Sequence, residues 1–213
     1  MSTDELISRL SRNIAPVPRH ALEKRFIMGV SGGFLASGIL LFLWLGFRPD
    51  LSEVAFTRPF LTKLLYTVAL FAASIPLSLH LMRPEGKTGR SYALLFVPVL
   101  VLGLAATAEF SLAPHENRAQ LLFGHGVLPC LIRILIISTP IFAGLLWSAK
   151  SFAPTRLRAA GAAAGLMSGS LAAGLYAFHC IEPSASFVFV WYSLGIAITS
   201  ALGALLAPLV LRW

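Results

Sequence analysis

Charged residues are scarce in this chain, because Asp, Glu, Lys and Arg together make up 12% of its 213 residues. A soluble domain carries about 25% charged residues. Hydrophobic residues make up 57% of the chain, and they occur in long uninterrupted blocks. The scarcity of charge argues against an ordinary soluble domain, and the apolar blocks predict an integral membrane protein.

Sequence motifs of the common enzyme classes are also missing. We find no glycine-rich phosphate loop, no HExxH motif and no GxSxG nucleophile elbow. The 9 Asp and Glu residues are scattered along the chain, which argues against a catalytic pair of carboxylates. We therefore predict that the protein is not an enzyme and that it holds no constitutive cofactor.

Six apolar blocks are long enough to cross a bilayer, since a transmembrane helix needs about 20 residues to span about 30 Å of hydrocarbon. They cover residues 26–47, 60–82, 92–113, 127–147, 157–179 and 187–211. We expect an all-α fold, with residues 26–213 forming a polytopic six-helix transmembrane bundle behind a polar tail at residues 1–25. The connecting loops are too short for a second folded domain.

The basic residues predict the orientation of this bundle. The net charge is +8, and most Lys and Arg residues lie in the tail, at residues 82–91, at residues 148–156 and at the C terminus. Short loops rich in Lys and Arg stay in the cytoplasm, so both termini are predicted to be cytoplasmic. Because topology explains the excess of positive charge, we expect no direct contact with nucleic acid.

The tail contains a short amphipathic pattern. Leu6, Ile7, Leu10 and Ile14 fall on one face of a predicted helix that begins near Ser2. A helix of about 12 residues is marginal alone in water, so its apolar face needs a surface to cover it. Two surfaces fit, the lipid interface of the membrane and the groove of a cytoplasmic partner protein. The pattern alone does not distinguish them.

Only 2 cysteines occur, and both are expected at the same end of neighbouring spans, because Cys130 opens the fourth block and Cys180 closes the fifth. The charge pattern makes this the non-cytoplasmic, oxidising face. His125, His179 and Glu182 lie close by in the sequence, and such side chains ligate divalent metals. Three interpretations stay open. The cysteines form a structural disulfide, or they sense the outside as a reversible thiol pair or a metal site of Cys130, Cys180 and His179, or they are two unpaired packing thiols.

Small and charged residues inside the blocks give two further expectations. Gly161, Gly165 and Gly169 form a smooth helix face, which favours close packing inside the bundle, with homodimerisation as the alternative. Lys63, Glu109 and Arg133 lie near the predicted outer ends of their blocks. We expect Lys63 and Arg133 to reach the membrane interface or to pair with Glu109, Glu116 or Asp50. No ionisable residue lies at the centre of a block, which argues against the alternative function of an ion-coupled transporter.

Several motifs along the chain resemble those of the NrsF-type membrane anti-sigma factors, the negative regulators of sigma F. The matching segments cover nearly the whole chain, and the most specific are the one that ends at Cys180 and the one that begins at Trp191. They are Asp4-Glu5-Leu6-Ile7, Ala15-Pro16-Val17, Arg48-Pro49-Asp50-Leu51, Pro129-Cys130, Ala153-Pro154-Thr155, Tyr176-Ala177-Phe178-His179-Cys180, Trp191-Tyr192-Ser193-Leu194-Gly195-Ile196 and Leu211-Arg212-Trp213.

This resemblance implies a six-span protein of the bacterial inner membrane that holds an extracytoplasmic-function sigma factor inactive. With such a partner, the apolar face of the tail, Leu6, Ile7, Leu10 and Ile14, is the expected contact for the sigma factor, and the exact contact residues stay open. The resemblance also implies that Cys130 and Cys180 take part in the response to heavy-metal or oxidative stress, with a divalent metal as a signal and not as a resident cofactor. A structural subunit of a membrane complex remains an alternative to this function.

Overall fold

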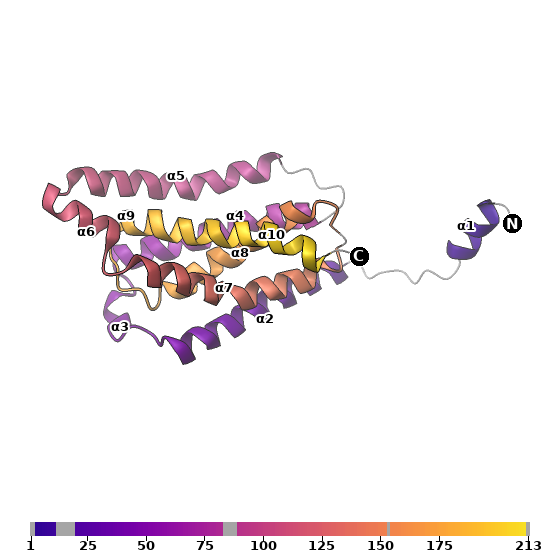
Figure 1. Cartoon of the computed structure of the whole chain (residues 1–213), viewed down its shortest axis with the longest axis horizontal. Helices are drawn as coiled ribbons and strands as arrows, with labels where there is room; N and C mark the ends of the chain where they lie inside the picture. The colour runs from indigo at the N-terminus through magenta and orange to yellow at the C-terminus, as the bar shows by residue number, and fades with distance from the viewer. Residues whose placement is uncertain (1–2, 12–19, 83–88, 153, 212–213) are drawn as a thin grey trace.

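Six long helices lie side by side along one direction in the computed structural model, which describes residues 3–11, 20–82, 89–152 and 154–211 (Figure 1). No strand occurs in these ranges, so the predicted all-α class is confirmed for them. The long helices are α2 (Ala21–Trp44), α4 (Arg58–Met82), α5 (Gly89–Leu112), α7 (Val127–Ala149), α8 (Leu157–Tyr176) and α10 (Ser193–Val210).

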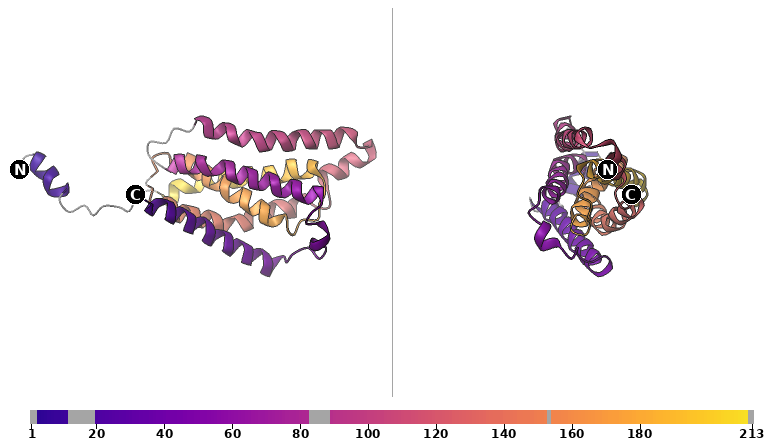
Figure 2. Two further views of the ribbon diagram at one scale, coloured as in Figure 1. Left: turned by 180° about the vertical axis from the view of Figure 1, so that it is seen from behind. Right: turned by 90° about the vertical axis from the view of Figure 1, so that its left-hand side faces the viewer.

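Short helical elements gather at one end of the bundle, which we call the capped end (Figures 1 and 2). The first residues of α2 and the last residues of α10 lie at the opposite end, the terminal end. A π-helix, η2 (Val188–Tyr192), leads into α10, and the tail contains α1 (Thr3–Ser11). The elements of the capped end are α3 (Leu51–Val54), η1 (His115–Asn117), α6 (Arg118–Phe123) and α9 (Ala185–Phe187).

Five segments of the described chain are long and apolar enough to cross a membrane. They are Ala21–Trp44, Arg58–Met82, Tyr92–Leu112, His115–Ala149 and Ala185–Val210. The sixth predicted block, residues 157–179, corresponds to α8, which ends earlier, at Tyr176. Small residues dominate α8, and most of them are buried against α4, α7 and α10. Its composition therefore suits the interior of a bundle better than contact with lipid.

Glycines bring the backbone of α8 against that of α10. A Cβ atom at Gly161 would collide with the carbonyl group of Gly203, and one at Gly165 would collide with that of Thr199. A Cβ atom at Gly169 would meet the Thr199 side chain. Helices associate in lipid through such close packing, because no hydrophobic effect drives them together there. Since α10 of the same chain covers this face, it is not free to form a homodimer.

A second close contact joins α2 to α7. Gly29 of α2 lies against Gly144 of α7, so closely that neither position has room for a Cβ atom. The Ser37 hydroxyl of α2 donates a hydrogen bond to the Ile137 carbonyl oxygen of α7 (2.6 Å). The Ser148 hydroxyl of α7 donates in return to a backbone carbonyl oxygen of α2 (2.9 Å). These contacts tie α2 and α7 together along much of their length.

The glycine contacts predict that a change of glycine to alanine has different effects on stability at two positions. We expect Gly165→Ala to lower the free energy of unfolding by about 1–3 kcal/mol, because the new methyl group overlaps the α10 backbone. Gly38→Ala is the matched control, since the Cβ position there faces open space. The thermal midpoint of folded protein in mild detergent measures both effects. Equal midpoints for the two variants would show that the α8–α10 contact is not as close as described.

Candidate functional site

The capped end contains a cavity of about 530 Å³. Its walls come from the linker after α2, the first turn of α7 with the loop before it, and the loop after α8. Arginine, histidine, glutamate and cysteine side chains all reach these walls, unlike the almost purely apolar groove that lies between α2, α4 and α8. The cavity is therefore the polar site of the bundle, and it is the site at which the predicted sensing residues meet.

Both cysteines border this cavity. Cys130 lies in the first turn of α7 and is 1% exposed, and Cys180 lies in the loop after α8 and is 4% exposed. Both are free thiols. The pairing of neighbouring antiparallel helices thus brings together two residues that are far apart in the sequence, as expected. Because both sulfur-bearing side chains are buried, a reagent reaches them only through the cavity or after a local opening.

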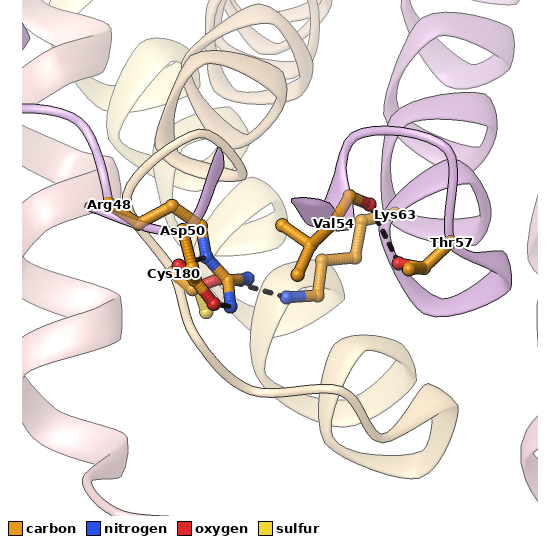
Figure 3. A network of polar contacts seen from close by, with 6 residues as sticks. All are labelled: Arg48, Asp50, Val54, Thr57, Lys63 and Cys180. Atoms are coloured by element: carbon orange, nitrogen blue, oxygen red, sulfur yellow. Dashed lines mark hydrogen bonds and ion pairs between the residues drawn. The ribbon is translucent and has the colours of Figure 1, made fainter. Parts of the chain in front are cut away.

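The carbonyl oxygen of Cys180 accepts hydrogen bonds from two cationic side chains (Figure 3). Lys63 Nζ donates to it from α4 (3.1 Å), and the Arg48 guanidinium donates to it from the linker after α2 (3.3 Å). The sequence predicts that Lys63 reaches the membrane interface or pairs with an acidic residue. The first expectation is wrong, since the residue is 1% exposed and its amine points into the bundle. The hydrogen bond described for the amine goes to a backbone carbonyl oxygen instead of a carboxylate. A buried ammonium group needs such an acceptor, because it has lost its hydration.

Asp50 holds the Arg48 side chain in place. The Arg48 guanidinium donates two hydrogen bonds to the Asp50 carboxylate, both of 2.7 Å. These bonds lower the pKa of Asp50 and raise the pKa of Arg48. The stabilisation from Asp50 is therefore complete above the ordinary pKa of a carboxylate, and it is lost as the pH falls through the lowered value. At neutral pH both groups are charged. Nearby, the Thr57 hydroxyl donates to the Val54 carbonyl oxygen (2.7 Å) and closes the turn before α4 (Figure 3).

Both ring nitrogens of His179 have protein partners. The Arg133 guanidinium lies 3.2 Å from His179 Nε2, and because arginine only donates, Nε2 accepts this hydrogen bond. The proton of the neutral ring then lies on Nδ1, which donates to the Gly46 carbonyl oxygen (3.1 Å). Arg133 also contacts the Tyr176 hydroxyl (3.5 Å). His179 thus fastens the loop after α8 to the linker after α2.

Glu182 fastens the same loop to the start of α7. Its carboxylate is almost buried, and it accepts hydrogen bonds from the backbone N–H of His125 (2.6 Å) and from His125 Nδ1 (2.8 Å). Gly124 precedes this contact with a φ of 51°, in the left-handed region that favours glycine. A Cβ atom at position 124 would also overlap the Glu182 carboxylate. The left-handed backbone conformation of Gly124 and the contact between Glu182 and His125 therefore depend on each other.

Sequence reasoning missed the role of Glu109, a lone carboxylate within the apolar block of α5. It accepts hydrogen bonds from the Ser184 hydroxyl (2.9 Å), from the Ser186 N–H (2.8 Å) and hydroxyl (2.8 Å), and from the Ala185 N–H (3.2 Å). It thus caps the helix that starts at α9 and continues into α10. The signal in the sequence was the cost of a carboxylate inside an apolar block, which requires partners.

Two of the residues proposed for the sensing or metal site, His179 and Glu182, are already engaged with protein groups. His179 has no free ring nitrogen, and Glu182 is paired with His125. Within residues 3–11, 20–82, 89–152 and 154–211, no group of three His, Cys, Asp or Glu side chains is arranged to hold a metal ion. Metal or thiol sensing at Cys130 and Cys180 therefore stays a prediction, and a metal would require these contacts to rearrange.

The predicted tail helix is present as α1, which covers nine residues rather than about 12. Leu6 and Ile7 are 43% and 58% exposed, so both apolar side chains are available to a partner or to lipid. The side chain of Leu10 and the whole of Ile14 lie outside the described residues. The contact that this face makes stays a prediction.

Comparisons with known proteins agree over the whole chain. One family, described as NrsF, negative regulator of sigma F, matches residues 10–213. The "Probable anti-sigma-F factor NrsF" of Azospira oryzae is 37% identical over 215 residues, which cover 100% of both chains. The "Anti-sigma-F factor NrsF" of Caulobacter vibrioides is 34% identical over 217 residues, again with 100% of both chains covered. No solved structure matches.

The contacts of Glu182 predict a local loss of stability. We expect Glu182→Ala to lower the free energy of unfolding by about 1–3 kcal/mol, because it leaves the His125 N–H without an acceptor in a partly buried loop. Glu116→Ala in exposed η1 is the control and should be close to neutral. Chemical unfolding in detergent measures stability, and the rate of maleimide labelling at Cys130 should rise only in the first variant. Indistinguishable variants would contradict the described role of Glu182.

Proposed function

This chain belongs to the family of negative regulators of sigma F, and we therefore propose that it is an anti-sigma factor of the bacterial inner membrane. It keeps an extracytoplasmic-function sigma factor inactive by binding it at the cytoplasmic side. It releases the sigma factor when heavy metal or oxidant acts on Cys130 and Cys180 at the opposite side. Similarity to anti-sigma-F factors over the full length of both chains is the observation that carries this proposal.

The arrangement of the helices supports a protein that crosses the membrane six times, with both termini in the cytoplasm. The start of α2 and the end of α10 lie together at the terminal end of the bundle (Figure 1). Large apolar side chains are exposed along α2 and α5, where water would solvate them poorly and membrane lipid would cover them. In this orientation the capped end, with its cavity, faces the periplasm.

The tail offers an apolar face for contact with the sigma factor. Leu6 and Ile7 are exposed on α1, and by the helical spacing Leu10 and Ile14 extend the same apolar face. A helix of this length is marginal alone, so binding in the groove of a partner would stabilise it. The tail immediately precedes α2 in the sequence, which places the bound sigma factor next to the membrane and away from RNA polymerase.

The thiols have the chemistry that a sensor needs. To move the sigma factor from mostly bound to mostly free, the resting and the stimulated states of the protein must differ by a few kcal/mol in the free energy with which they bind it. About 1.4 kcal/mol corresponds to a tenfold change in the dissociation constant. Oxidation of a dithiol supplies energy on this scale, because about 30 mV of redox potential corresponds to about 1.4 kcal/mol. The buried positions of Cys130 and Cys180 favour small reagents that can enter the cavity.

The tail contact is tested by charging its apolar face. We expect the double variant Leu6→Glu and Leu10→Glu to abolish co-purification of the sigma factor in mild detergent, because two carboxylates would enter an apolar groove. Ser8→Glu places a carboxylate on the opposite face of α1 and should leave binding unchanged. The amount of each variant in the membrane fraction controls for expression. Wild-type binding by the double variant would remove this face from the interface.

The thiol contact is tested in cells with a reporter gene that depends on the sigma factor. We expect Cys130→Ser and Cys180→Ser to lower the induction by cadmium or by a thiol oxidant about tenfold or more, because the reactive sulfur is gone. Repression without inducer should persist in both variants, since the tail is intact. Full induction in the double serine variant would exclude the thiols from sensing, without affecting the anti-sigma function itself.

A further inference from the structure

Residues 46–48 and 178–180 form a set of contacts that we call the clip. The Arg48 N–H donates to the Phe178 carbonyl oxygen (3.1 Å), and the Arg48 guanidinium donates to the Cys180 carbonyl oxygen (3.3 Å). His179 Nδ1 donates to the Gly46 carbonyl oxygen (3.1 Å). Three consecutive residues that end in a thiol are thereby attached to the linker that directly follows α2. A displacement of Cys180 cannot leave this linker unaffected.

Cys130 is attached to the same helix by another route. It lies in the first turn of α7, and α7 contacts α2 through the paired glycines Gly29 and Gly144. Ser148 of α7 also donates a hydrogen bond to the Arg25 carbonyl oxygen near the start of α2 (2.9 Å). The two thiols therefore border one cavity and each is connected to α2, one through the clip and one through α7.

We propose that α2 carries the state of the two thiols to the cytoplasmic tail, and that the clip is the joint through which Cys180 acts on α2. The identity of the partner in this inference rests on the proposed function, whereas the shift of α2 does not. Among the described long helices, α2 is the one that follows the tail in the sequence, so a shift of α2 moves the helix end nearest to the tail along the chain.

Burial explains why a change at sulfur would move the clip. Cys180 is 4% exposed, and a close-packed interior accommodates added atoms only by displacing its neighbours. The segment nearest to the sulfur that can move is the loop that contains residues 178–180, because α7 and α8 are long helices that pack against their neighbours along their length. Small displacements of this kind become helix shifts, because packed interfaces switch between discrete arrangements.

Arg48 is the residue to test, because its guanidinium is the side chain of the linker that binds the Cys180 carbonyl oxygen directly. Full-length protein in mild detergent is treated with N-ethylmaleimide in a Cys130→Ser background, so that only Cys180 reacts. The sulfur adds to one carbon of the maleimide double bond and the thiol proton goes to the other, so no further reactant is needed. Mass spectrometry measures the modified fraction in every sample.

Two measurements report the outcome, namely hydrogen exchange of residues 20–44 and affinity for the sigma factor. In the Cys130→Ser background, maleimide should raise exchange in α2 and weaken sigma binding about tenfold or more. Adding Arg48→Gln should weaken both responses at equal modification of Cys180, because the bond from the linker to the Cys180 carbonyl oxygen is lost while the two other bonds of the clip remain. Arg58→Gln, which changes an exposed arginine at the start of α4, is the matched control and should retain both responses.

Three results would overturn the inference, and one would instead concern the proposed function. The inference is wrong if maleimide leaves hydrogen exchange in α2 unchanged in the Cys130→Ser protein. It is also wrong if Arg48→Gln leaves both responses undiminished, or if Arg58→Gln diminishes them to the same extent. Absence of sigma binding before treatment would contradict the proposed function, while hydrogen exchange would still decide the role of α2. If the Arg48→Gln protein is not monodisperse, His179→Gln, which removes the bond to Gly46, replaces it under the same criteria.

Discussion

The Cys180 carbonyl oxygen, which accepts hydrogen bonds from both Lys63 and Arg48, is the contact on which the capped end depends. An ammonium group buried near the end of a membrane-spanning helix is costly unless an acceptor replaces its hydration. The loop after α8 provides that acceptor, and Asp50 orients the arginine that shares it. The position of the loop follows from these partners, and with it the position of the Cys180 side chain beside Cys130 at the cavity.

Close backbone packing gives this polar end a rigid base. Glycine contacts join α8 to α10 and α2 to α7, so the helices that lead away from the cavity approach each other more closely than larger side chains would allow. Around the cavity, His179, Glu182 and Arg133 are engaged with other protein groups. Cys130 and Cys180 remain as free thiols in the wall.

The long apolar blocks made the helical fold predictable from the sequence. Blocks predicted at 26–47 and 60–82 correspond to α2 (Ala21–Trp44) and α4 (Arg58–Met82), with boundaries that differ by a few residues. Both helices begin earlier than their blocks because polar residues also form helix, and α2 ends earlier than its block, close to Gly46 with its φ of 68°. For α8 the glycine spacing favoured packing inside the bundle, but a helix of small residues can also face a partner chain. Only the packing of α10 against it decides between the two.

The sequence alone determined that two cysteines lie at one end of neighbouring helices, since the alternation of antiparallel spans fixes the end at which each residue lies. It did not determine the partners of Lys63, Glu109 or Arg48, and for Lys63 the expectation of an interfacial position was wrong. Apart from Asp50, which lies two residues from Arg48, those partners are distant in the sequence, and they depend on how each helix is rotated and on the path of each loop. Such quantities result from packing the whole bundle at once, so only the tertiary structure decided them.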